Sequence, residues 1–230
     1  MNKIIRREHF QDVLRVLRFD DTEYRRQHRR DYKLESIREC FDLSVSTLLD
    51  GNVPGPMLTV DEELVTFRRR CPFKQYIPSK LGRYGIKFWI LSDSKSCYVY
   101  NMETYIGKKL NAGRKVNLGE KVVLHLLEGI DAAGRNFTCD NFFYKLIVCK
   151  KVAGKNITLV GTIRKNIPEF PLEMISTKER KPFTALFEFQ HECMIVSYCP
   201  KKNKIFNLLS TLHSESKFDT FNEQRTRRLS

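Results

Sequence analysis

Residues 58–73 read LTVDEELVTFRRRCPF, and the rest of the chain is interpreted outward from this stretch. Apolar and β-branched residues dominate residues 57–67, which predicts a largely buried strand. Asp61, Glu62 and Glu63 lie in its middle, and buried carboxylates cost free energy unless they are paired, solvated or bound to a cation. From the residues alone, this cluster is either a solvated strand end or part of a metal site.

The segments that follow predict a sheet that begins antiparallel. Strand-like runs occupy residues 84–91 (YGIKFWIL) and 97–105 (CYVYNMETY), with turn residues between them. No helix fits between these first three strands, so they should form an antiparallel meander. Residues 119–128 (GEKVVLHLLE) then predict a helix with one apolar face.

A second acid follows a fourth predicted strand. In residues 134–143, GRNFTCDNFF, the alternation of side chains places Asp140 near the strand end. A helix over 142–153 and a strand over 156–163 are expected next, and this alternation implies parallel additions to the sheet. The predicted fold is therefore mixed α/β with a ribonuclease H-like core, in which Asp61 and Asp140 come side by side.

Composition shifts predict four segments. Residues 1–56 are helical and end at a Gly- and Pro-rich breaker, and residues 57–166 form the core. Residues 167–212 contain three strand-like runs and are expected to form an added β-rich unit, not a continuation of the mixed sheet. Residues 213–230 are polar and basic and are expected to be disordered.

The charge balance indicates a polyanionic partner. Lys and Arg outnumber Asp and Glu by 41 to 27, which gives a formal charge of +14 and favours nucleic acid first and an anionic membrane surface second. The sequence predicts neither a membrane-spanning segment nor a signal peptide, so an intracellular chain is expected, with no membrane partner. Seven scattered cysteines without a CxxC pair favour reduced thiols.

Two adjacent carboxylates predict a divalent-metal site. They repel each other, and Mg²⁺ suits such a pair because it accepts carboxylate oxygens while keeping waters and substrate phosphate oxygens. Two such ions roughly 4 Å apart stabilise the attacking and leaving oxygens of an in-line phosphoryl transfer. The expected chemistry is cleavage and joining of DNA strands.

Long runs of the chain closely resemble the piggyBac family of DNA transposases and the cellular proteins derived from them. The runs that carry the resemblance are LTVDEELVTFRRRCPFKQYIPSKLGRYGIKFWILSDS (58–94), GRNFTCDNFF (134–143), ITLVGTIRKN (157–166), LRFDD (17–21), DYKLESIRE (31–39), VSYCPKK (196–202) and LLST (208–211). The resemblance implies that Asp61 and Asp140 are the first two members of a catalytic set of three aspartates. It also implies that the region before Pro56 belongs to a helical DNA-binding and dimerisation part. A nuclear location is expected, and a homodimer is compatible with the resemblance.

Some family features have no match. The third aspartate lies in a KGGVD-like motif that this sequence lacks, as it lacks the family's cysteine-rich zinc-binding end. Nothing around Asp219 resembles that motif. Arg69 occupies the glycine position of a usual FRGRCPF turn, where a positive φ would cost arginine roughly 1 kcal/mol.

Three functions stay open on this basis. The first, and the preferred one, is a catalytically incomplete transposase copy that binds DNA and holds metal weakly. The second is an active strand-transfer enzyme whose third carboxylate is Glu62, Glu63 or Asp219. The third is a domesticated, non-catalytic DNA-binding module.

The DNA-contacting residues are expected to follow the acidic strand and to rim the active site. This first set comprises Arg68, Arg69, Arg70, Lys74, Lys80 and Arg83. Arg164 and Lys165, after the strand ITLVGTI, form a second candidate set.

Overall fold

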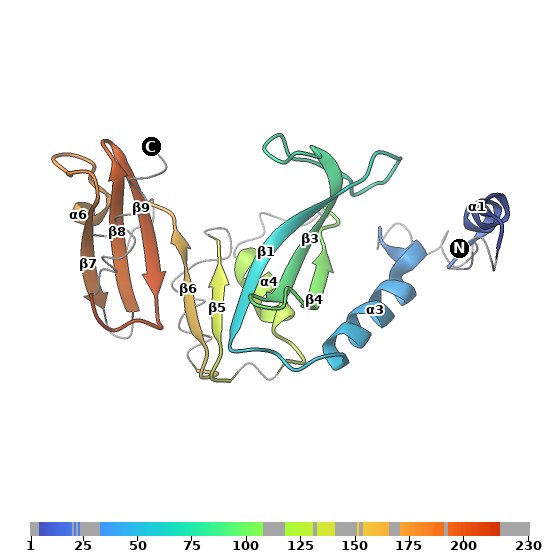
Figure 1. The fold of residues 1–230 in the computed structure, drawn as a ribbon, viewed down its shortest axis with the longest axis horizontal. Helices are drawn as coiled ribbons and strands as arrows, with labels where there is room; N and C mark the ends of the chain where they lie inside the picture. The colour runs from blue at the N-terminus through green and yellow to red at the C-terminus, as the bar shows by residue number, and fades with distance from the viewer. Residues whose placement is uncertain are drawn as a thin grey trace. The chain divides into compact units, whose positions relative to one another are not determined.

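The computed structural model describes residues 5–19, 21, 23, 33–107, 118–130, 133–140, 151, 154–165, 171–190 and 193–216 (Figure 1). Its helices are α1 (Arg7–Val16), the 3₁₀ helix η1 (Glu35–Ile37), α3 (Arg38–Asp50), α4 (Leu118–Leu126) and α6 (Leu172–Ile175). Its strands are β1 (Met57–Thr66), β2 (Gln75–Tyr76), β3 (Tyr84–Asp93), β4 (Val99–Thr104), β5 (Asn136–Cys139), β6 (Thr158–Ile163), β7 (Thr184–Gln190), β8 (Cys193–Lys201) and β9 (Lys204–Ser210). None of the helices in this part of the chain has the length and apolar character needed to cross a bilayer.

The described strands form one mixed sheet in the hydrogen-bonded order β2-β3-β1-β5-β6-β9-β8-β7, with β4 also paired to β3. β1 and β3 are antiparallel, because the Phe67 amide donates to the Tyr84 carbonyl and the Ser94 amide donates to the Met57 carbonyl. β5 is parallel to β1, and β6 is parallel to β5. The predicted mixed α/β fold, antiparallel at first and parallel afterwards as in a ribonuclease H-like core, is confirmed.

Alternation along the central strands separates a buried face from an exposed one. On β1, Leu58 and Val60 are buried, whereas Asp61 is exposed. On β5 and β6, Phe137 and Leu159 are completely buried at paired positions next to Leu58. This apolar face fixes the register, because a slip by one residue would bring the exposed face into the core.

The three C-terminal strands continue the sheet, and the sequence-based separation of this β-rich unit was wrong in that respect. β9 pairs antiparallel with β6 from Ile163↔Asn207 to Val160↔Ser210. β8 and β7 then follow in antiparallel order. Without β9, the outer edge of β6 would keep unpaired backbone groups, and β9 alternates buried and exposed residues as β6 does. Pairing of the two strands is therefore more favourable than a separate β layer. The segment boundaries themselves stay a prediction.

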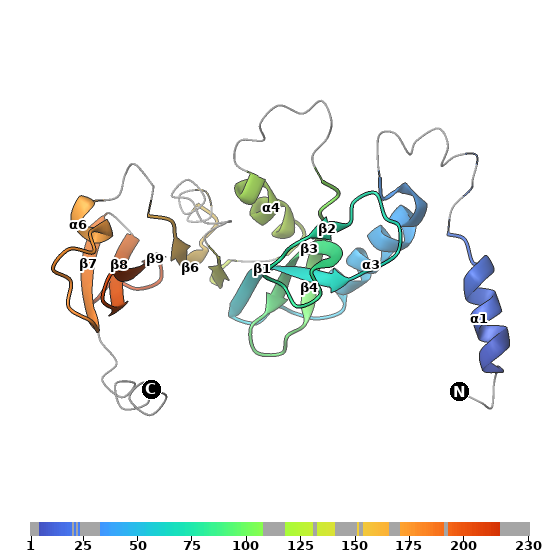
Figure 2. The same ribbon diagram turned by 90° about the horizontal axis from the view of Figure 1, so that it is seen from above.

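A short helix covers one face of this continuation. Figures 1 and 2 both show α6 beside β7, β8 and β9. Its Met174 is buried, and the Ser197 hydroxyl of β8 donates to the Met174 carbonyl over 2.6 Å. Arg180 donates to the Ser197 carbonyl over 2.7 Å, which attaches the loop after α6 to the same strand.

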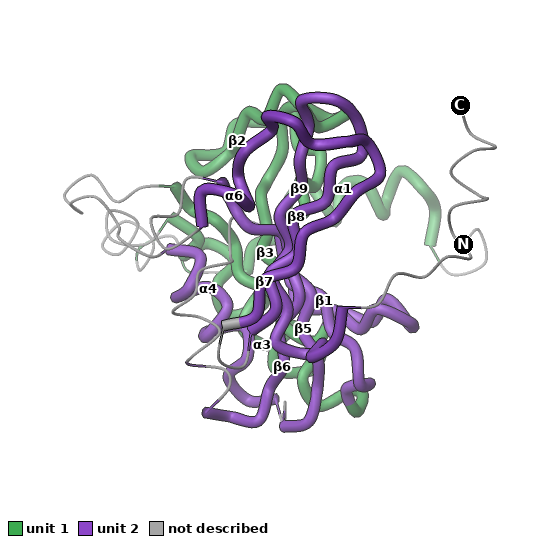
Figure 3. The backbone as a smooth tube through the Cα atoms, turned by 90° about the vertical axis from the view of Figure 1, so that its left-hand side faces the viewer, with its two compact units in different colours: residues 1–53, 62–89, 100–113 green, residues 54–61, 90–99, 114–230 purple. Residues whose placement is uncertain are grey.

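The chain divides into two compact units, coloured separately in Figure 3, and each is described by itself below. Unit 1 comprises residues 1–53, 62–89 and 100–113, and unit 2 comprises residues 54–61, 90–99 and 114–230. Two predicted features, most of the helix over 142–153 and the tail after residue 216, lie outside the described residues.

Candidate functional site

The site is built on the parallel pair β1–β5 in unit 2. The register joins Thr59 to Thr138 and Val60 to Cys139, so the next residues are Asp61, within β1, and Asp140, directly after the end of β5. Paired residues of parallel strands direct their side chains to the same face, and neighbouring strands lie about 4.8 Å apart. Both aspartates are exposed. The register thus brings together the two acids that the sequence predicted.

A threonine on the third strand positions one of the two carboxylates. The hydroxyl of Thr162 donates to Oδ1 of Asp140 over 2.8 Å. β6 brings it there because Gly161 pairs with Cys139, which places Thr162 beside Asp140 on the exposed face. The sequence analysis missed Thr162, although the alternation of residues 158–163 next to a parallel strand was a signal for it.

The loop that leads into β1 is anchored by Asp93, a buried carboxylate that the sequence analysis also missed. It accepts hydrogen bonds from the backbone amides of Ser96 (2.7 Å), Lys95 (2.9 Å) and Gly55 (3.1 Å) and from the Ser96 hydroxyl (3.0 Å). These donors, the Ser96 amide foremost, hold the pKa of Asp93 below its ordinary value, against the opposing effect of burial. Gly55 is required there, since a Cβ at this position would lie 2.2 Å from Oδ2 of Asp93.

The neighbouring acid Glu62 belongs to a different interaction, within unit 1. Its carboxylate contacts Nζ of Lys87 and lies 3.9 Å from Nζ of Lys80. Lys87 also lies over the Trp89 ring, 5.7 Å from its centroid. Alternation directs Glu62 to the opposite face of β1 from Asp61. Glu62 is therefore a structural ion-pair residue and a poor candidate for a third metal ligand.

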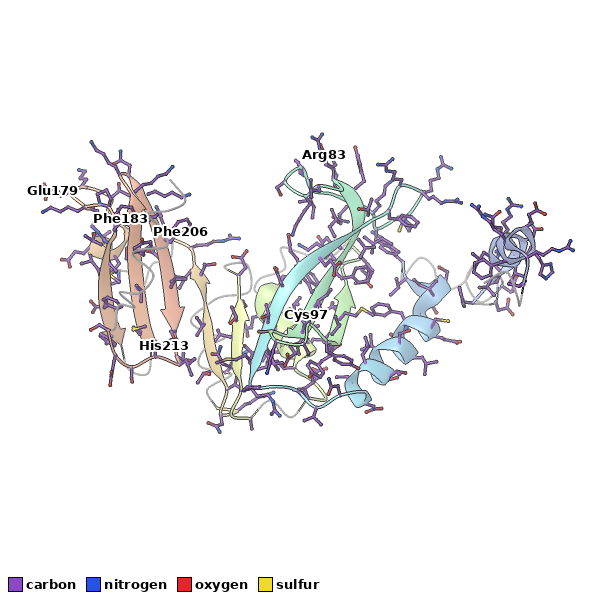
Figure 4. The ribbon with its side chains drawn as sticks, in the orientation of Figure 1. Arg83, Cys97, Glu179, Phe183, Phe206 and His213 are labelled. Atoms are coloured by element: carbon purple, nitrogen blue, oxygen red, sulfur yellow. The ribbon has the colours of Figure 1, made fainter. Side chains whose placement is uncertain are left out.

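The predicted basic residues fall into two groups, one in each unit. Figure 4 shows Arg83 on the loop that enters β3, and this exposed arginine has a left-handed φ of 45°. In the same unit Arg68, Arg69 and Arg70 are exposed. Arg69 is not among the residues with positive φ, so the backbone strain expected for an arginine with positive φ at this position does not arise.

The predicted lysines are less available for contact with phosphates than the exposed arginines. Lys74 is half-buried and donates to the Arg69 carbonyl over 3.2 Å, and Lys80 is half-buried beside Glu62. Arg164 and Lys165 of unit 2 are exposed directly after β6. That the predicted basic residues rim an active site stays a prediction.

The donor set of Asp61 and Asp140 is compatible with Mg²⁺. This ion is commonly held by one or two carboxylates and completes its octahedron with water and phosphate oxygens. Across the described ranges, no group of three or more His, Cys, Asp or Glu side chains is placed to hold a metal ion. A magnesium site at the two aspartates stays a prediction.

Comparison with known proteins agrees with this arrangement. A family described as Transposase IS4 matches residues 1–229. The human "PiggyBac transposable element-derived protein 3" is 32% identical over 133 residues, which cover 54% of this chain and 22% of that protein. The human "Chimeric ERCC6-PGBD3 protein" is also 32% identical over 133 residues, which cover 54% of this chain and 12% of that protein.

A solved structure is similar over nearly the whole chain. It is the cryo-EM structure of a piggyBac transposase synaptic complex with hairpin DNA, with a TM-score of 0.87 and 34% sequence identity. The match covers 95% of this chain and 46% of that chain, so the present chain spans less than half of each of these relatives. Because the family match extends over almost all 230 residues, the chain belongs to the Transposase IS4 family and carries a piggyBac-family transposase domain.

Proposed function

We propose that this chain binds DNA and that Asp61 and Asp140 together hold a divalent ion, Mg²⁺, at the phosphodiester backbone. The observation that carries the proposal is the β1–β5 register, which makes the two acids neighbours on one exposed face. Two carboxylates at adjacent strand positions repel each other, and a divalent cation between them relieves that repulsion.

Two further observations support DNA as the partner. The formal charge is +14, and the exposed residues Arg68, Arg70 and Arg164 are positioned after strands of the sheet. The solved relative was determined in a complex with hairpin DNA, and the similarity to it covers 95% of the present chain. A nuclear location and a homodimer form part of the same proposal.

The residues of the site have separable roles. Asp61 and Asp140 would supply the carboxylate oxygens, and Thr162 restricts the rotation of Asp140 by its hydrogen bond. Asp93 holds the loop before β1 through its hydrogen bond from the Gly55 amide. A Mg²⁺ ion held by these carboxylates would supply Lewis-acid polarisation of a phosphoryl oxygen. The chain by itself is proposed to bind DNA with little or no turnover.

Fluorescence anisotropy with a labelled DNA duplex, with and without Mg²⁺, tests both parts of the proposal. Wild-type protein should bind in EDTA with an affinity that falls steeply with salt, and Mg²⁺ should strengthen binding. Asp61→Asn and Asp140→Asn should abolish the Mg²⁺ effect, whereas Glu188→Gln on exposed β7 should retain it. A Mg²⁺ effect that survives both aspartate substitutions would overturn the metal assignment, and no binding in any condition would overturn DNA as the partner.

A Mg²⁺-dependent nicking assay on DNA with terminal inverted repeats addresses turnover separately. The proposal expects no product above background from the 230-residue chain. Nicking that disappears in Asp61→Ala would instead identify an active enzyme.

A further inference from the structure

An exposed pair of tyrosines lies on the two strands that follow the basic turn of unit 1. β2 and β3 pair antiparallel with Tyr76 directly opposite Tyr84. The two ring centroids are 4.7 Å apart and the ring planes are inclined by 37°. The residues are 53% and 50% exposed, so about half of each lies outside any core. Two aromatic rings that pack against each other and remain exposed to solvent can stack with a planar ligand.

The backbone around the pair is fixed by hydrogen bonds. The Ile77 amide donates to the Arg83 carbonyl over 2.7 Å, and the Phe67 amide donates to the Tyr84 carbonyl over 3.1 Å. Gly85 allows the close approach of the strands, because a Cβ there would lie 2.3 Å from the Val65 carbonyl oxygen. The rings are therefore carried by a constrained ladder, which lowers the entropy lost when a ligand stacks on them.

Cationic residues lie near the pair in space or in sequence. Nζ of Lys74 lies 5.6 Å from the centroid of the Tyr84 ring, and Arg83 precedes Tyr84 directly in the sequence. The loop from β1 to β2 adds the exposed residues Arg68, Arg69 and Arg70. Aromatic rings between cationic side chains are the combination by which proteins hold unpaired nucleotides, with bases on the rings and phosphates at the cations.

We propose that Tyr76 and Tyr84 form a stacking platform for an unpaired base of a DNA strand, with the neighbouring arginines at its phosphates. Duplex DNA does not offer this contact, because both faces of each internal base are already stacked in the helix. The platform therefore selects single-stranded or locally opened DNA. This inference rests on the proposed DNA binding and adds the strand form that the chain prefers.

The test compares Tyr76→Ala, Tyr76→Trp and a control, Phe206→Ala. Phe206 lies on β9 in unit 2, is 46% exposed and has Nζ of Lys204 4.8 Å from its ring centroid, so it matches Tyr76 in exposure and has a comparable cationic neighbour. Circular dichroism first establishes that each variant is folded. The probes are a short single strand with one 2-aminopurine, whose fluorescence falls on stacking, and a duplex of the same length.

The wild-type protein should quench 2-aminopurine in the single strand. Tyr76→Ala should lower the single-strand affinity roughly 5- to 150-fold and lose the quenching. Tyr76→Trp should retain both, and Phe206→Ala should behave as wild type. The duplex affinity and its salt dependence should be the same in all four proteins.

Two outcomes separate this inference from the proposal on which it rests. Unchanged single-strand affinity and quenching in Tyr76→Ala, with salt-dependent duplex binding intact, would overturn the stacking platform alone. Failure of the wild-type protein to bind either form of DNA would overturn both proposals.

Discussion

At the scale of single residues, the hydroxyl of Thr162 supports the two aspartates. Its hydrogen bond to Asp140 restricts the rotation of a carboxylate on the exposed face. A ligand that is already oriented loses less side-chain entropy when an ion binds, and ligand-supporting hydrogen bonds of this kind commonly affect metal affinity 10- to 100-fold.

Substituting Thr162 should weaken metal binding without unfolding the protein. Thr162→Val keeps the shape of the side chain and removes the donor, so we expect about a tenfold loss of Mn²⁺ affinity in an isothermal titration. Thr162→Ser retains the hydroxyl and should stay close to wild type. If the valine and serine variants bind equally well, the hydrogen bond has no role in the site.

Asp93 makes the stability of the fold depend on pH. Its pKa is lower in the folded chain than its ordinary value, because the Ser96 amide and its neighbours stabilise the carboxylate. The carboxylate therefore stabilises the fold above the ordinary pKa of an aspartate, about 3.9, and this contribution is lost as pH falls through the lowered folded pKa.

The matching experiment follows the free energy of unfolding of wild type and Asp93→Asn between pH 7 and pH 3. The two should differ most near neutral pH, with the variant less stable, and should converge in acid. Asp42→Asn, at an exposed helical position 3.5 Å from Arg38, should show little difference at any pH. A gap for Asp93→Asn that is constant with pH would refute the proposed linkage.

At the scale of elements, the turn after β1 presents exposed arginines to solvent. Arg68 and Arg70 are exposed there, whereas Lys74 and Lys80 are held by Arg69 and Glu62. An exposed arginine can approach a phosphate without first breaking an internal contact. On exposure, the arginines are the stronger candidates for phosphate contacts among the six basic residues predicted near β1.

Charge reversal at Arg68 and Arg70 should weaken DNA binding more than reversal at Lys201 and Lys202. The lysines are exposed at the β8–β9 turn and serve as the matched control, because the change in net charge is the same. The slope of log K against log salt should decrease by about 0.9 for each phosphate contact that is lost. Equal losses for the two double variants would refute the assignment of the β1–β2 turn.

The strand pairings differ in whether they could be predicted from the sequence. Asp61 and Asp140 could be predicted as neighbours, because the succession of strands and helices is that of a ribonuclease H-like core, whose first and fourth strands lie side by side. The β6–β9 pairing could not, since a stretch with prolines separates these strands and pairing over that distance is set by tertiary packing. The two-residue strand β2 was missed because its pairing depends on contacts such as Tyr76 with Tyr84, not on a periodic run.

At the scale of the whole molecule, the two acids belong to unit 2 and the aromatic and arginine-rich turn belongs to unit 1. The proposed metal-binding pair therefore belongs to one unit, and the proposed surface for phosphates and bases belongs to the other. The family match extends over residues 1–229, so both features lie within a single transposase domain. The resemblance found in the sequence identified this family, whereas Thr162 and the tyrosine platform became evident only from strand register.

The most direct test of the site is a Mn²⁺ titration, followed by electron paramagnetic resonance, of wild type, Asp61→Asn, Asp140→Asn and the double variant. If both carboxylates hold one ion, each single substitution should weaken binding nearly as much as the double substitution, because the ligands act together. Additive losses from the two single substitutions, or wild-type affinity in the double variant, would contradict a shared site.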